Sequence, residues 1–257
     1  MHNPTAMLVL PVALALGSQT AFADSTFSVS AGLDYSTGNY GSSSDTRIWY
    51  YPFMAKYESD ALTLKLSVPY LKITGPSNVV AAAGQPIQVG TNATRRSESG
   101  AGDVLAAASY NVFDHRSAGL LIDLTAKIKF ATADEAKGLG TGENDYALQA
   151  DITKSLGQYS VFGTLGRRKY GDPPGVDFRN PWYATLGAAY KISAAMTSGL
   201  SYDYRERVLT SASAVSEVTG FVSYKLTPTS KLQGYLVKGF SDASPDWGAG
   251  VVVSTSF

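Results

Sequence analysis

The chain has 257 residues, with 21 basic and 21 acidic side chains that balance to no formal net charge, so it has neither the basic field that recruits nucleic acid nor an acidic tail. Cysteine is absent and histidine occurs only at positions 2 and 115, which excludes disulfides, thiol nucleophiles and cysteine-ligated metal centres. Charged residues make up 16%, below the share of about a quarter that is usual in soluble domains.

The N-terminal segment is typical of a secretory signal. Ala6–Gly17 is an apolar run too short to span a bilayer as a helix. Ala21-Phe22-Ala23 then provides a small-x-small cleavage pattern. No Lys or Arg precedes the apolar run, and a buried N-terminal helix is the alternative. We predict a signal peptide at 1–23 and a mature chain at 24–257.

The remaining sequence alternates between apolar and polar residues along most of its length. In the segment 120–130, for example, Leu124 and Phe130 belong to an apolar row, whereas Asp123, Lys127 and Lys129 belong to a mostly polar one. In an extended strand these two rows face opposite sides. Twelve such segments are predicted, at 25–36, 45–58, 60–74, 101–114, 117–131, 142–155, 157–170, 179–193, 195–207, 213–227, 229–241 and 245–257.

The connections between these segments alternate in length. Short links lie near residues 59–60, 115–116, 156–157, 194 and 228, and the others are longer. Short turns at one end and long loops at the other are typical of an up-and-down transmembrane β-barrel. The fold class predicted is therefore all-β, an antiparallel barrel of about 12 strands. An even strand number places both termini on the periplasmic side.

Strand length and aromatic placement agree with a membrane barrel. About ten residues, at ~3.3 Å each and a tilt of ~40°, cover the ~25 Å apolar band of an outer-membrane barrel. Tyrosines and tryptophans fall near predicted strand ends, where amphipathic rings favour the membrane interface. A soluble sandwich with aromatic strand ends is the alternative. The last segment ends the chain at Phe257, which resembles the signal that outer-membrane barrels present to their assembly machinery.

If the apolar rows face lipid, the opposite rows face the lumen. Both charge signs occur there, so the sequence predicts no simple ion preference. The side chains could form internal salt bridges that support a narrow barrel, or they could contact a solute. The candidate lumen-lining residues are Lys65, Asp123, Lys127, Lys129, Asp151, Arg168, Asp203, Arg205, Arg207, Glu217 and Lys225.

The longest predicted connection, 75–100, is expected on the extracellular side. Loops of this length in compact proteins are usually functional or disordered. Its apolar core, 79–83, could fold inward as a constriction, or the segment could be a mobile surface loop; the second is slightly favoured.

A hydrolase would need a nucleophilic serine beside an oriented histidine. His115 is the only histidine of the mature chain and falls on a predicted short turn, where we expect a solvated residue. Asp203 and Glu206 lie on opposite strand faces, which makes them a poor acid–base pair. We therefore expect no enzyme activity, no cofactor and no metal.

Several stretches resemble the outer-membrane family named after the MetA pathway of phenol degradation. They are SVPYLKITGPSN at 67–78, GAGDVLAAASYNVF at 100–113, the GDPPGVDFRNPWY segment within 170–193, and LQGYLVKGFSDASPDWGAGV at 232–251. The resemblance spans most of the mature chain, but these are strand and turn patterns without chemistry. It implies an outer-membrane barrel that passes small solutes, and it supplies no substrate residues.

The sequence therefore predicts an outer-membrane channel or facilitator for passive passage of small solutes. The alternatives are a closed structural barrel whose extracellular loops bind a partner, and an outer-membrane hydrolase. Expected partners are outer-membrane lipid, the assembly machinery through Phe257 and an unidentified small solute, but no nucleic acid.

Overall fold

The computed structural model describes residues 25–82, 85–89 and 94–257. The expected signal peptide, 1–23, lies outside the described residues. The strands are β1 Thr26–Gly38, β2 Thr46–Ser59, β3 Leu62–Pro76, β4 Val79–Ala82, β5 Gln85–Gln88, β6 Arg95–Ala101, β7 Val104–His115, β8 Leu120–Phe130, β9 Asp145–Leu156, β10 Tyr159–Lys169, β11 Trp182–Lys191, β12 Met196–Arg205, β13 Val215–Lys225, β14 Ser230–Gly239 and β15 Trp247–Ser256. A 3-10 turn, η1, spans Arg116–Ala118.

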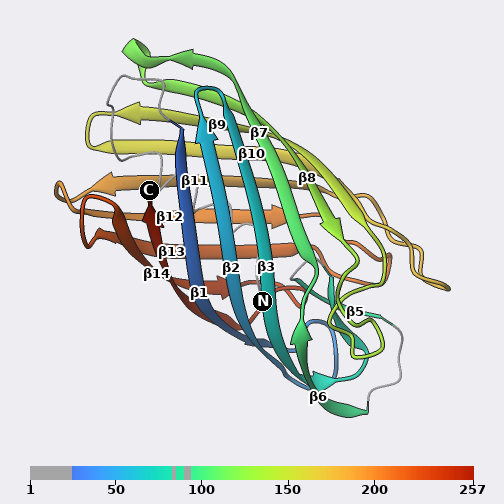
Figure 1. The fold of residues 1–257 in the computed structure, drawn as a ribbon. Helices are drawn as coiled ribbons and strands as arrows, with labels where there is room; N and C mark the ends of the chain where they lie inside the picture. Colours follow the sequence, from blue (N-terminus) through green and yellow to red (C-terminus); the bar gives the residue numbers. More distant parts are fainter. Residues whose placement is uncertain (1–24, 83–84, 90–93) are drawn as a thin grey trace.

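The strands close into an antiparallel barrel (Figure 1). In the described part of the chain, thirteen strands form one sheet, and β2 pairs with β3 to complete the circle. Both β6 and β7 pair with β3, one after the other along its length, and so form a single interrupted wall strand. Thirteen strands less one gives the twelve wall strands that the alternation predicts. Closure pairs the backbone groups that a sheet edge would otherwise expose to lipid.

The predicted alternation of connection lengths is confirmed. Turns of two to four residues join β2 to β3, β7 to β8, β9 to β10, β11 to β12 and β13 to β14. With β6 and β7 counted as one wall strand, the other connections between wall strands are longer. The two ends of the barrel chain meet at the short-turn end, where the Phe257 N–H donates to the Phe27 carbonyl at 2.8 Å.

The outer surface is apolar, as the period-two pattern predicts. Leu148, Leu186 and Leu236 are each at least 65% exposed. The predicted interfacial aromatic residues, including Trp49, Trp182 and Trp247, also lie on the exposed face. A monomeric soluble protein does not expose apolar surface around its whole circumference. The soluble-sandwich alternative is therefore excluded, and the surface is that of a barrel embedded in lipid.

The structure differs from the predicted strand at 101–114 because the wall continues back to Arg95. The interruption between β6 and β7 lies at Gly102, whose N–H donates to the Pro69 carbonyl at 2.9 Å. A Cβ at Gly102 would lie 2.7 Å from a Leu71 methyl and 3.0 Å from the Pro69 ring, so this close approach requires glycine. The interruption leaves the neighbouring Asp103 buried.

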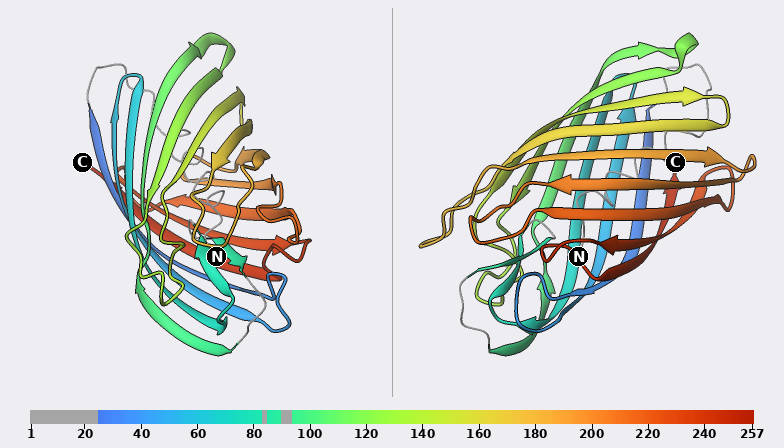
Figure 2. Two further views of the ribbon diagram at one scale, coloured as in Figure 1. Left: turned by 90° about the vertical axis from the view of Figure 1, so that its right-hand side faces the viewer. Right: turned by 180° about the vertical axis from the view of Figure 1, so that it is seen from behind.

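The described part of the apolar core of the expected 75–100 loop, residues 79–82, lies inside the barrel mouth instead of on the surface. Strands β4 and β5 form a hairpin in which Val79 and Ala81 are buried in one cluster with the wall residues Tyr50, Leu71 and Ile73. Figure 2 shows this hairpin between opposite walls at the long-loop end. Burial of these side chains supplies the hydrophobic stabilisation that a surface loop would lack.

No helix in the described ranges is long and apolar enough to cross a membrane.

The lipid-facing assignment is tested by Leu124→Arg. Leu124 is 52% exposed and lies near the middle of β8. A charge at this depth of a barrel costs about 2–4 kcal/mol. Urea unfolding of protein refolded into lipid vesicles measures the loss. Ser43→Arg, at an exposed loop position, is the matched control and should have almost no effect. Equal stability of the two variants would mean that the faces are inverted.

Candidate functional site

The interior contains a cavity of about 380 Å³ along one half of the barrel. Its lining comes from β1–β3 and β7–β11 and runs from Asp60 at the short-turn end to Lys129 and Asp145 near the long loops. The other half contains an apolar cluster that includes Phe221, Tyr235 and Val252 and that meets the cavity at Phe162. Any passage through the described barrel therefore follows the wall formed mainly by β2, β3 and β7–β10.

Strand register aligns four cationic side chains of this wall in one row. Lys56 on β2 is opposite Lys65 on β3, and the row continues through Ala107 to Lys127 on β8. It then passes through Ala147 to Arg168 on β10. We call Lys56, Lys65, Lys127 and Arg168 the cationic row. Small alanine side chains separate Lys65 from Lys127 and Lys127 from Arg168, which leaves space between the long side chains.

A second row, four residues away along the strands and thus displaced by about 13 Å, carries the carboxylates. Asp123 on β8 is opposite Asp151 on β9, and the row continues through Thr164 and Thr185 to Asp203 and Glu217. We call Asp123, Asp151, Asp203 and Glu217 the carboxylate row. Strand register thus places the basic and the acidic side chains, which are interspersed along the sequence, in two separate rows.

Neutral side chains donate hydrogen bonds to three carboxylates of this row, those of Asp123, Asp151 and Asp203. Asp151 accepts hydrogen bonds from Thr125 at 3.0 Å, Thr164 at 2.6 Å and the Gln149 amide at 2.7 Å. Asp123 accepts one from the Asn111 amide at 2.8 Å. Like charges directly opposite on neighbouring strands are destabilising, and these hydrogen bonds offset the repulsion between Asp123 and Asp151.

Asp203 is similarly bound by Thr185 at 2.7 Å and Ser201 at 3.2 Å.

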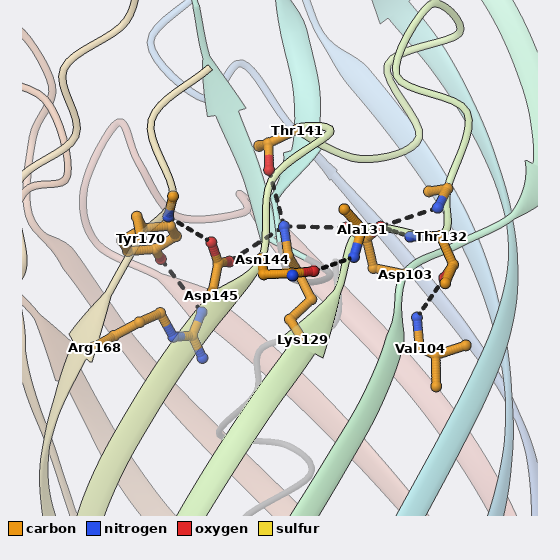
Figure 3. A network of polar contacts seen from close by, with 12 residues as sticks. Asp103, Val104, Lys129, Ala131, Thr132, Thr141, Asn144, Asp145, Arg168 and Tyr170 are labelled. Atoms are coloured by element: carbon orange, nitrogen blue, oxygen red, sulfur yellow. Dashed lines mark hydrogen bonds and ion pairs between the residues drawn. The ribbon is translucent and has the colours of Figure 1, made fainter.

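Near the long loops, a buried ion cluster anchors connecting segments to the wall (Figure 3). The Lys129 Nζ lies 3.2 Å from Asp103 Oδ2 and 3.3 Å from Asp145 Oδ2, and it donates to the Thr141 hydroxyl at 2.8 Å. Asp103 also accepts backbone N–H bonds from residues 132 and 133. The loop between β8 and β9 is thus tied to the wall at both of its ends. We call Asp103, Lys129, Thr141 and Asp145 the anchoring cluster.

Tyr170 joins a second long loop to this region. Its hydroxyl accepts hydrogen bonds from Arg205 at 3.1 Å and Arg168 at 3.3 Å. Burial by itself raises the pKa of Tyr170, but the two guanidinium charges together outweigh burial and leave the pKa below its ordinary value. The next residue, Gly171, donates its N–H to Asp145 at 3.1 Å, so this loop is also linked to the anchoring cluster.

The anchored loops and the β4–β5 hairpin cover the mouth. The Ala81 N–H donates to the Gly138 carbonyl at 3.0 Å, and Leu139 is buried in the same cluster as Val79. On the other side of the hairpin, Ile87 packs in a cluster with Tyr170, Phe178 and Val208. We call the hairpin together with loops 131–144 and 170–181 the mouth cover.

The structure brings many of the residues proposed from the sequence to the barrel interior. Six of them line the cavity: Lys65, Asp123, Lys127, Lys129, Asp151 and Arg168. Asp203, Arg205 and Glu217 are buried outside that cavity lining. Lys225 lies with Lys191 and Lys231 in a small recess near the short-turn end. Arg207 follows the end of β12, is exposed and bonds to the Thr210 carbonyl, so it does not belong to this interior set.

Sequence reasoning missed Asp103 and Asp145 as partners of Lys129. Asp103 lies in the interruption of the wall, outside the period-two alternation, whereas Asp145 is the first inward residue of β9 and lies three residues beyond the start of the predicted segment 142–155. The Gly-Ala-Gly-Asp run that ends at Asp103 was the only local signal of an irregular strand.

His115 lies at the exposed end of β7. Its Nε2 is 3.2 Å from the Ser117 hydroxyl, in an exposed turn at the short-turn end. The turn holds these groups away from the described cavity, whose lining includes neither residue.

Solved structures with a similar fold are outer-membrane channels and porins. The COG4313 outer membrane channel from Pseudomonas putida F1 matches with 16% identity over 93% of this chain and 97% of that chain, at a TM-score of 0.68. KdgM porin matches with 13% identity over 90% and 99% of the two chains, at a TM-score of 0.56. No protein-family model and no curated protein matches the chain. The fold is that of a bacterial outer-membrane barrel.

The anchoring cluster is tested by Lys129→Met. The substitution leaves two buried carboxylates without their cation, which costs about 3–5 kcal/mol when a buried pair is broken in this way. We expect lower stability in urea and new protease cleavage within 131–144. Lys137→Met is the matched control, because Lys137 pairs with Asp134 in the same loop at 3.6 Å with both side chains about half exposed. Such surface pairs contribute at most about 1 kcal/mol. Unchanged protection of the loop in Lys129→Met would contradict the anchoring role.

Proposed function

We propose that the protein is an outer-membrane channel for passive passage of small solutes. The observation that carries the proposal is the cavity of about 380 Å³, whose lining spans much of the barrel wall and combines charged and polar side chains with a larger apolar share. A lumen needed only for structural support is filled by side chains, as the half around Phe221 and Tyr235 is. The half along β7–β10 keeps open space beside ionised groups.

The mouth cover limits passage at the long-loop end. The loops of the cover are held by the anchoring cluster, and the hairpin is held by short backbone hydrogen bonds and two apolar clusters, so a rearrangement of the hairpin opens the route while the anchored loops and the wall stay in place. This end is the extracellular one in the proposed orientation, with both termini periplasmic. The alternative of a closed barrel whose loops bind a partner requires that the cover never opens.

The proposal includes three finer assignments. The chain belongs with the MetA-pathway family that its strand and turn motifs resemble. Phe257, 76% exposed at the last position, is the group that the barrel assembly machinery recognises. The protein is a channel and not an enzyme, which the exposed turn position of His115 favours.

Channel function is tested by filling the cavity with Ala107→Trp. Ala107 lines the cavity, and the larger ring narrows the route beside Lys65 and Lys127. In planar bilayers we expect discrete single-channel current from the wild type and about a twofold or larger fall in conductance for the variant, because conduction follows pore radius.

Ala108→Trp is the matched control, since the next residue on the strand is exposed on the lipid face. Its conductance should equal that of the wild type. A correctly folded wild-type barrel that carries no current would overturn the proposal and favour the closed barrel. Equal conductance of both variants would show that ions do not pass through this cavity.

A further inference from the structure

Lys65 and Lys127 are the two members of the cationic row without a hydrogen-bond or ion-pair partner in the described chain. Lys56 pairs with Glu58 at 2.5 Å, and Arg168 donates to the Tyr170 hydroxyl. In the described part of the chain, neither Lys65 nor Lys127 forms a hydrogen bond or ion pair, and both side chains line the cavity. We call Lys65 and Lys127 the lysine pair.

The nearby carboxylates are already occupied. Asp123 and Asp151 lie on the same wall, but their oxygens accept hydrogen bonds from amides and hydroxyls of neighbouring strands. Asp151 accepts hydrogen bonds from three side chains and Asp123 from one, and both lie four residues along the strands from the row of the lysines, about 13 Å away. The lysine pair therefore presents its charge to the cavity.

Register sets the separation of the pair. Both lysines are opposite Ala107, one on each side, so their backbones are two strands apart, about 10 Å. Flexible lysine side chains over a small alanine can converge on one solute or hold two acidic groups of one molecule. Met54 and Phe162 line the same cavity and provide apolar contact for a carbon skeleton.

The cationic row also has a direction. Lys56 and Lys65 lie three residues from the short-turn ends of β2 and β3, whereas Lys127 lies three residues from the long-loop end of β8. Arg168 is one residue from the long-loop end of β10. The cationic row therefore extends from near the short-turn end of the barrel to near the long-loop end, because residues paired across tilted strands lie at successively different heights.

We propose that the lysine pair is a binding site for small organic carboxylates, and that the cationic row guides them along the channel. The inference rests on the proposed channel function and names its solute class. Ammonium groups without protein counter-ions in a confined cavity concentrate anions, and binding to more than one cation in sequence permits both entry and release.

The test combines ion selectivity and block in planar bilayers. In a KCl gradient at low ionic strength, wild-type current should be anion-selective, and succinate should reduce the chloride current. Succinamide, which has the same skeleton without charge, should not. Lys65→Gln with Lys127→Gln should lower the anion-to-cation permeability ratio by about threefold or more and raise the half-blocking succinate concentration by about tenfold. Both effects should shrink at about 1 M salt, where the Debye length is about 3 Å.

Lys137→Gln with Lys169→Gln removes the same charge from exposed positions and should behave as the wild type. Heat-modifiable gel mobility checks folding, and Lys65→Arg with Lys127→Arg should keep both selectivity and block. The inference fails, with the channel intact, if wild-type current lacks anion selectivity or if succinamide blocks as well as succinate. It also fails if the glutamine variant keeps the wild-type block. A folded wild type without current overturns the inference together with the channel.

Discussion

The requirement that every backbone N–H and C=O in the hydrocarbon be paired within the protein governs this structure. Strands meet that requirement only when the sheet closes, and here β2 and β3 complete the circle. Closure fixes one register between each pair of strands, because a slip of one residue would turn the apolar row inward. Where a wall strand is irregular, as at Gly102, its N–H still donates a hydrogen bond to the Pro69 carbonyl of the neighbouring strand. The irregularity then turns Asp103 toward the interior, where it becomes part of the anchoring cluster.

Fixed register also determines the electrostatics of the lumen. The residues of the cationic row come from four strands and those of the carboxylate row from four, with β8 contributing to both. Neutral amides and hydroxyls on adjacent strands bind the carboxylates, so the two signs do not simply cancel in internal salt bridges. The supporting role and the solute-binding role of charged side chains are therefore divided between the rows. Asp123 and Asp151 line the cavity too, but their hydrogen bonds join them to neighbouring wall residues, whereas the lysine pair has no such partner in the described chain.

The long-loop end is built on a different principle. Beyond the ends of the wall strands, the loops are held by the buried Lys129 and by apolar packing instead of a continuous ladder of backbone hydrogen bonds. Lys129 contacts Asp103 in the wall interruption and Asp145 on β9, and it also lines the cavity. The group that anchors the cover is therefore part of the cavity wall. A rigid wall with a separately anchored cover can change its opening without unfolding, which is the mechanical basis of the proposed channel.

The sequence alone determined the strand number, the lipid-facing rows and the alternation of turns and loops, because side-chain alternation is a local property of an extended chain. It also placed Lys65, Lys127 and Arg168 on inward-facing rows. It did not reveal that Lys65 and Lys127 are both opposite Ala107, since that depends on register between strands far apart in the chain. Nor did it find the Lys129 partners, and between the two placements that it allowed for the apolar segment of the long loop it slightly favoured the surface. Those follow from contacts across the mouth that only the closed barrel brings within reach.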